Sequence, residues 1–204
     1  MELTDLVIER LLLVIPLIMS ITVHEWAHAV SAAWLGDDTA RLLGRNTLNP
    51  LAHVDPLGTL LLPLLGVPFG WAKPVPVNPV RFRRGVSMQT GVLIVALAGP
   101  VSNLLLAAVC VLLSTTAFVR DTSGLNQGVE TLVMMNLGLA VFNLLPIPPL
   151  DGSRIADALM PRRLRPYWHS VSNVGFALLI LLFLLPLVFR GINIVQLLFE
   201  TLPI

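Results

Sequence analysis

The stretch "LLLVIPLIMSITVHEWAHAVSAAWL", residues 11–35, decides the fold. It carries one charged side chain, and a helix of this length would reach about 37 Å, enough to cross a bilayer with some tilt. Ionisable side chains at membrane depth are costly and usually mark function. His24, Glu25 and His28 are therefore the first candidates for a functional site.

The composition is that of an integral membrane protein. The 204 residues are 55% hydrophobic and 12% charged, whereas soluble domains carry about 25% charged residues. We predict one membrane-embedded domain over residues 1–204, with its motifs between about 20 and 160. The net charge of +1 gives no sign of nucleic-acid binding. The single cysteine, Cys110, cannot form an internal disulfide and is interpreted as a small core or lipid-facing residue.

Further apolar runs predict an all-α membrane protein with about four transmembrane helices. These runs cover residues 85–119, 131–150 and 171–189. Residues 56–71, between the first and second spans, are also apolar. Their prolines and glycines favour a re-entrant or interfacial segment over a long helix. Residues 71–82 alternate proline with valine, which predicts extended backbone near the membrane surface. This whole connection either lines a substrate entrance or simply packs against the helices.

The distribution of lysine and arginine predicts the orientation. Residues 36–85 carry six of these side chains and residues 151–170 carry four, whereas the opposite side carries three. The positive-inside rule makes the two rich connections cytoplasmic, so both termini face outward. The two histidines then lie in the cytoplasmic half of the first span.

The spacing of the histidines predicts a metal site. On a helix, positions i and i+4 share one face, so His24 and His28 can bind one ion. Glu25 follows the first ligand, as in zinc hydrolases, where such a glutamate is the general base for water activated by the ion. A purely structural role would leave three costly groups on one helical turn without partners.

A catalytic zinc needs a third protein ligand and one open position. The candidates are His53, Asp55, Asp151, Asp157 and His169. Asp151 ends the third apolar run at the level of the histidines, directly after prolines that break the helix. We therefore expect it to bind the metal rather than only to cap a helix. A local turn is expected for Asp55, which precedes a proline, and an interfacial position for His169.

Polar residues in two of the later runs allow more than one interpretation. Asn143 lies eight residues before Asp151, where it either joins helices or donates a hydrogen bond to an oxyanion. Ser102 and Asn103 lie beside Gly99 and are interpreted as close helix packing.

Two motifs together resemble the site-2 protease family of intramembrane zinc metalloproteases. That family pairs H-E-x-x-H with N-x-x-P-x-P-x-x-D-G on a later helix. Here the motifs are "HEWAH" at 24–28 and "NLLPIPPLDG" at 143–152, and every fixed position matches. "AGPVSN" at 98–103 is similar to the family's Gly-Pro segment. The resemblance covers residues 20–160 and is closest to compact prokaryotic members.

The resemblance implies one zinc ion per chain, bound by His24, His28 and Asp151. It makes Glu25 the general base and Asn143 a residue that assists the oxyanion or positions substrate. The expected substrates are transmembrane segments of other proteins in a prokaryotic cell membrane. No PDZ-like or cystathionine-synthase-like domain is expected, because the hydrophilic segments are short. The competing interpretation is a non-hydrolytic metal-binding scaffold or a transporter, but a transporter would usually show repeated halves. The sequence does not indicate an oligomeric state.

Overall fold

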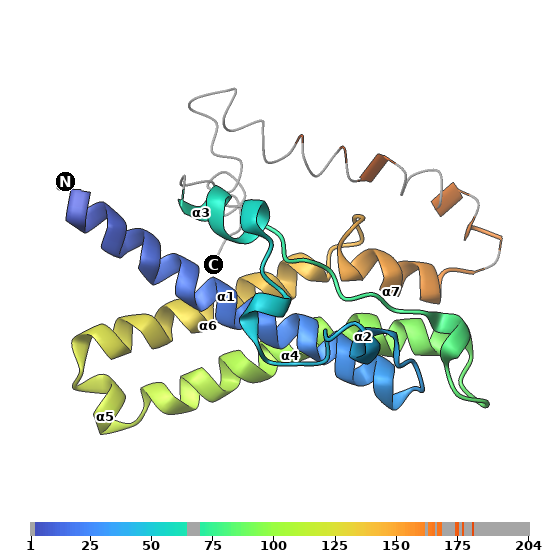
Figure 1. The fold of residues 1–204 in the computed structure, drawn as a ribbon, viewed down its shortest axis with the longest axis horizontal. Coiled ribbons are helices and arrows are strands. Elements are labelled where there is room, and N and C mark those ends of the chain that lie inside the picture. Colours follow the sequence, from blue (N-terminus) through green and yellow to red (C-terminus); the bar gives the residue numbers. More distant parts are fainter. Residues whose placement is uncertain are drawn as a thin grey trace, which may run out of the picture.

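The computed structural model describes residues 3–64 and 70–161, together with 163–165, 167, 168, 174, 175, 177 and 181. Every regular element within these residues is helical. Three long helices make the bundle: α1 (Leu3–Trp34), α4 (Met88–Ser114) and α6 (Ser123–Asn143). α4 contacts both α1 and α6, which also contact each other, and α7 (Asp151–Leu159) packs against α4 (Figure 1).

Short elements connect the long helices. They are α2 (Thr39–Leu42), the 3₁₀ turn η1 (Pro50–Ala52), the π-helical turn η2 (Pro56–Leu61), α3 (Leu62–Leu64), the 3₁₀ turn η3 (Pro79–Arg81) and α5 (Ala117–Arg120).

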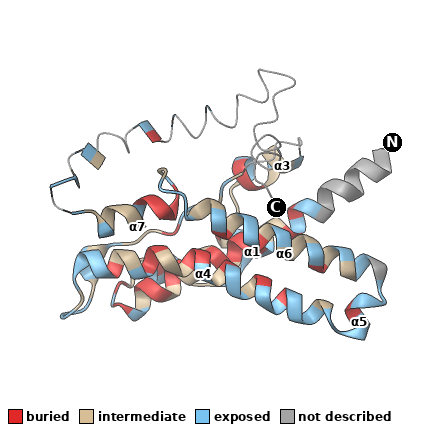
Figure 2. Ribbon diagram, turned by 180° about the vertical axis from the view of Figure 1, so that it is seen from behind, coloured by how far each residue is buried: buried red, intermediate tan, exposed pale blue. Residues whose placement is uncertain are grey.

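Small side chains bring the three long helices close together. Ala32 on α1, Ala96 on α4 and Ala140 on α6 are all buried. Small residues at helix crossings let backbones approach closely, which is how helices associate in a membrane. Exposed residues cover much of the outer surface of α4 and α6 (Figure 2), and many of them are large and apolar. Such a surface suits lipid.

The predicted all-helical class is confirmed for the described residues, and two of the described helices are long and apolar enough to cross a bilayer. These are residues Leu13–Trp34 of α1 and the whole of α4. α6 begins at Ser123, eight residues before the predicted third run, and its first half carries polar side chains. The predicted fourth run, residues 171–189, lies outside the continuously described residues.

The connection between α1 and α4 runs without helix from residue 70 to 78, in agreement with the predicted extended backbone. Hydrogen bonds with side chains hold this segment in place. The Asp37 carboxylate is fully buried and accepts a hydrogen bond from the Asn78 N–H at 2.6 Å. The Thr59 hydroxyl donates to the Trp71 carbonyl at 2.8 Å. The predicted local turn at Asp55 is also confirmed, because its carboxylate caps η2. This segment passes beside α1 at the level of the histidines.

The proline-rich segment after α6 delivers Asp151 to the bundle. α6 ends at Asn143, three residues before Pro146, and α7 begins at Asp151 itself. A Cβ atom on Gly152 would lie 2.3 Å from the carbonyl oxygen of Leu144. Only glycine permits this close approach, so Gly152 allows the start of α7 to pack against the end of α6.

Candidate zinc centre and active site

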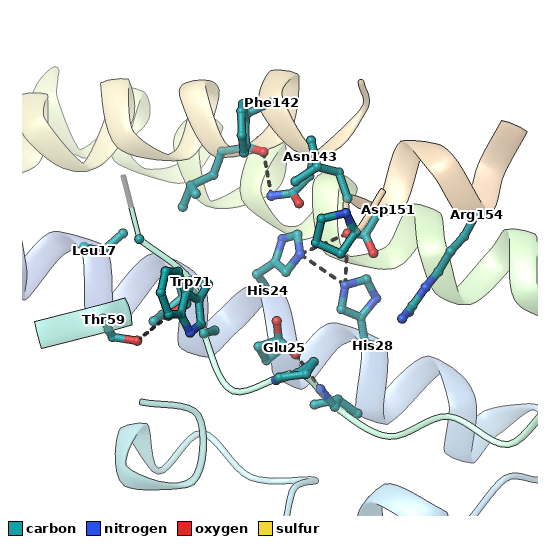
Figure 3. Close-up of a pocket in the computed structure, with 18 residues that line it drawn as sticks. Leu17, His24, Glu25, His28, Thr59, Trp71, Phe142, Asn143, Asp151 and Arg154 are labelled. Carbon is teal, nitrogen blue, oxygen red and sulfur yellow. Dashed lines mark hydrogen bonds and ion pairs between the residues drawn. The ribbon is translucent and has the colours of Figure 1, made fainter. Parts of the chain in front are cut away.

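Three buried side chains from two helices converge at one point. His24 and His28 come from consecutive turns of α1, and Asp151 is the first residue of α7 (Figure 3). The two Nε2 atoms lie 3.1 Å apart, and each lies 3.1 Å from Asp151 Oδ2. Within the described part of the chain, these three side chains form the group able to hold a metal ion.

Hydrogen bonds leave both ligating nitrogens without a proton. The Nδ1–H of His24 donates to Asn103 Oδ1 at 2.5 Å, and the Nδ1–H of His28 donates to the Val95 carbonyl at 2.7 Å. In each neutral ring Nε2 is then a bare acceptor. Apart from these rings, no donor among the described residues reaches Asp151 Oδ2. Three acceptors therefore face one another, which a cation stabilises.

The arrangement fits zinc. Zinc binds histidine nitrogen and carboxylate oxygen at roughly 2.0–2.2 Å, so tetrahedral ligand atoms lie roughly 3.3–3.6 Å apart. The three observed separations of 3.1 Å are close to that range. Two histidines and a carboxylate are also a typical donor set for catalytic zinc, and histidine ligands usually donate their other N–H to an oxygen, as both do here.

Glu25 lies beside this centre and is held by backbone. Its Oε2 accepts a hydrogen bond from the Val75 N–H at 2.9 Å, so the extended segment fixes the carboxylate. Arg45 is buried nearby and donates to the Lys73 carbonyl. Burial lowers the pKa of Arg45, and attraction to Glu25 opposes that shift. The glutamate therefore has a cationic neighbour.

A cavity of about 420 Å³ joins the candidate metal ligands His24, His28 and Asp151 to Glu25. Leu17 and Ile21 of α1 and Phe142 of α6 make part of its wall apolar, and Trp71 lies on the side of the extended segment (Figure 3). Asn143 lines the same cavity and donates from Nδ2 to the Leu139 carbonyl of its own helix at 3.0 Å. It shares this cavity with the predicted metal ligands, and its hydrogen bond stays within α6.

The other described candidates for the third ligand do not join the centre. His53 is fully buried in the connection after α2, where its Nε2–H donates to the Thr47 carbonyl at 2.8 Å. Asp55 caps a turn, and Asp157 lies on α7 outside the metal-binding group. His169 lies outside the described residues. Of the five candidates, the structure brings Asp151 to the histidines.

Sequence reasoning missed two features of the centre. Asn103, interpreted as helix packing, bonds directly to His24. A Cβ atom on Gly99 would lie 2.5 Å from His28 Nε2 and 2.6 Å from His24 Cε1, so both rings pack against a bare backbone. The "AGPVSN" segment was the available signal for both.

Comparison with known proteins gives the family. The model of peptidase family M50 matches residues 120–185, which include the Asn143–Gly152 motif. A protein of Bacillus subtilis named "Putative zinc metalloprotease YwhC" is 45% identical over 182 residues, covering 86% of this chain and 81% of that protein. The chain belongs to peptidase family M50. Two proteins named "Putative zinc metalloprotease Rip2", from Mycolicibacterium smegmatis and Mycobacterium tuberculosis, are each 30% identical over 169 residues.

The M50 chain covers 65% of the length of these two Rip2 proteins. No solved structure shows significant similarity to it. The predicted family, the metalloprotease class and the zinc cofactor are confirmed by these relatives.

Proposed function

We propose that this M50 chain is an intramembrane endopeptidase in which His24, His28 and Asp151 hold one zinc ion and Glu25 is the general base. The observation that carries the proposal is the convergence of three buried acceptor atoms at 3.1 Å beside Glu25 in one cavity. When bound, zinc supplies a Lewis acid that lowers the pKa of a water molecule and polarises the scissile carbonyl.

The chain's own residues then move the protons. Glu25 accepts a proton from the attacking water and passes it to the leaving amine. The Val75 N–H holds the carboxylate in place for this role. Asn143 has two amide hydrogens, and its bond to the Leu139 carbonyl uses one of them. The other is available to donate to the oxyanion of the tetrahedral intermediate.

The substrate is a transmembrane segment that has lost its helical hydrogen bonds locally. A helical carbonyl is bonded and shielded, so the segment must unwind before attack. Lys73 and Val75 direct their N–H groups to the protein, at the His53 carbonyl and Glu25. In extended backbone, alternate residues direct these groups to opposite edges. The other edge of residues 70–76 carries Ala72, Pro74 and Pro76, and the two prolines have no N–H. An unwound substrate would therefore pair there mainly by donating its own N–H groups to the carbonyls of this edge.

The proposed topology has four spans, the cytoplasmic connections being residues 36–85 and 151–170. α1, α4 and α6 supply three spans, and the run 171–189 supplies the fourth. The metal centre then lies toward the cytoplasm, and cleavage falls toward that end of the substrate span. The bacterial relatives support a prokaryotic cell membrane.

The test uses the purified full chain with single-span substrates in liposomes. One substrate carries Gly-Pro in the cytoplasmic half of its span and a matched one carries Leu-Ala, because glycine and proline lower the cost of unwinding. The parent should cut the Gly-Pro substrate faster, and Glu25→Gln should reduce the rate by at least about 10²-fold. Mass spectrometry should map the cut to the cytoplasmic half.

Two results would contradict the proposal. Cleavage by Glu25→Gln at the parent rate would show that Glu25 is not the general base. A cut near the outer face would contradict the proposed orientation of the chain in the membrane, but not the proposed metal ligands.

A further inference from the structure

We infer that Asn103 is a positioning residue that holds His24 in its metal-binding tautomer, and that Asn136 and Ser20 fix the orientation of the Asn103 amide. The inference rests on the zinc site proposed above. It assigns a role to three polar residues in the membrane-embedded core that the proposed chemistry does not use.

The polar network crosses three helices. Ser20 comes from α1, Asn103 from α4 and Asn136 from α6, and all three are fully buried. Asn103 Oδ1 accepts from the His24 Nδ1–H at 2.5 Å, and Asn103 Nδ2 donates to Asn136 Oδ1 at 2.7 Å. Polar groups in such a core are costly unless every one finds a partner.

The far end of the network determines which way the Asn136 amide faces. Asn136 Nδ2 donates to the Leu132 carbonyl at 2.8 Å, and a carbonyl can only accept. The same nitrogen donates to Ser20 Oγ at 2.9 Å, since the Ser20 hydroxyl gives its own proton to the Pro16 carbonyl at 2.7 Å. Both amide hydrogens of Asn136 are therefore used, and its Oδ1 is the atom that faces α4.

The orientation of the Asn136 amide determines the tautomer of His24 through Asn103. Because Asn136 presents an oxygen, Asn103 must turn its NH₂ toward it, and the same NH₂ reaches the Ser20 carbonyl at 3.3 Å. Asn103 Oδ1 is then left facing His24 Nδ1, which must carry the proton. Nε2 of His24 is left as the lone-pair atom beside Asp151 Oδ2.

The two histidines are thus oriented in different ways. His28 donates to the Val95 backbone carbonyl, an acceptor that no side-chain change can reverse. His24 relies on an amide, which would present a donor if it flipped by 180°. A flipped Asn103 would favour the His24 tautomer with the proton on Nε2, and that nitrogen, the one beside Asp151, could then not bind zinc. The network through Asn136 prevents that flip.

The alternative is that these asparagines only join helices. The two interpretations differ in what a substitution changes. Loss of helix joining lowers the stability of the metal-free protein and leaves zinc affinity in the folded fraction unchanged. Loss of tautomer control lowers zinc affinity itself.

The experiment compares four variants of the full chain, purified in detergent and checked for folding by circular dichroism. Asn103→Leu removes the acceptor, Asn103→Asp keeps it, and Asn136→Leu removes only the partner that orients it. Ser102→Ala is the matched control, since its hydroxyl donates to the Gly99 carbonyl within α4. Zinc affinity is measured by competition with a chromophoric chelator. The thermal midpoint is measured with excess chelator, and the visible spectrum with Co²⁺ in place of zinc.

We expect Asn103→Leu to bind zinc roughly 10–100-fold more weakly than the parent, the usual effect of losing a residue that orients a histidine ligand. Asn103→Asp should stay within about threefold of the parent and keep its Co²⁺ spectrum, because either oxygen of a carboxylate accepts from Nδ1–H. Its loss of the NH₂ leaves Asn136 Oδ1 and the Ser20 carbonyl without a donor and should lower the metal-free thermal midpoint instead. Asn136→Leu should fall between the two, and Ser102→Ala should match the parent.

Parent-like zinc affinity in Asn103→Leu would overturn the inference, even if its metal-free form is less stable. Weak binding by Asn103→Asp, equal to that of Asn103→Leu, would also overturn it, since the acceptor would then be irrelevant. If Asn103→Leu does not fold, the zinc affinities of the other two variants decide. Weaker binding by Asn136→Leu than by Asn103→Asp supports the inference, and equal or stronger binding by Asn136→Leu overturns it. A parent that binds no zinc would instead refute the proposed ligand set.

Discussion

Replacing Gly99 by alanine should weaken zinc binding more than it weakens the fold. The new Cβ atom would lie 2.5 Å from His28 Nε2 and 2.6 Å from His24 Cε1. Non-bonded carbon contacts are normally about 3.5–4.0 Å long, so the two rings must withdraw by about 1 Å. Metal–ligand distances tolerate only about 0.2 Å, so the rings cannot withdraw and still hold the ion.

The size of the effect follows from the cost of overpacking. One extra methyl group in a filled site typically costs about 1–3 kcal/mol. In the metal-free protein the rings can turn away and release most of this strain. The strain then appears on binding, where about 1–3 kcal/mol corresponds to a loss of roughly 5- to 150-fold in zinc affinity.

The assay is chelator competition in detergent, with Gly138→Ala on α6 as the matched control. Among the described residues nothing lies within 4 Å of a Cβ atom at Gly138, so this variant should bind zinc like the parent. If Gly99→Ala binds zinc with parent affinity, the rings are not packed against α4 as described and the reasoning is refuted.

Three other variants and one treatment give further predictions. Glu25→Gln should keep one zinc per chain while its cleavage rate falls by about 10²–10⁴-fold; loss of metal would instead make Glu25 a ligand. Gly152→Ala places a Cβ 2.3 Å from the Leu144 carbonyl oxygen, so zinc per chain should drop with about 1–3 kcal/mol of stability. Asp37→Ala leaves the Asn78 N–H without its acceptor, and limited proteolysis should then cut residues 70–78 faster, at a cost of about 1–3 kcal/mol. Chelation should lower the thermal midpoint, because zinc at 100 times its dissociation constant stabilises the folded state by about 2.7 kcal/mol.

The convergence of the three proposed metal ligands was predictable because each has a strong local signal. His24 and His28 are four residues apart in an apolar run, which puts them on one face of any helix. The prolines before Asp151 predict the end of a helix, and α6 ends at Asn143, before the first of them. Asp151 could be chosen from five candidates by depth alone, because the positive-inside rule put it at the level of the histidines.

The remaining features depend on contacts that the sequence does not encode locally. His24 and Asn103 are 79 residues apart, and only the packing of α1 against α4 joins them. Val75 holds Glu25 through a backbone N–H, a group that every residue except proline possesses. The start of α6 was missed because its first turns are polar. Asn126 donates to Glu130 one turn later, a pairing that supports a helix without an apolar face.

Elemental analysis of zinc per chain, in the detergent-purified parent, Asp151→Ala and Glu25→Gln, is the most direct test of the proposed ligand set. We predict about one zinc in the parent and in Glu25→Gln, and loss of zinc in Asp151→Ala, because a catalytic zinc needs its third ligand. Zinc retained at the parent level in Asp151→Ala would show that α7 does not bind the metal and would contradict the account.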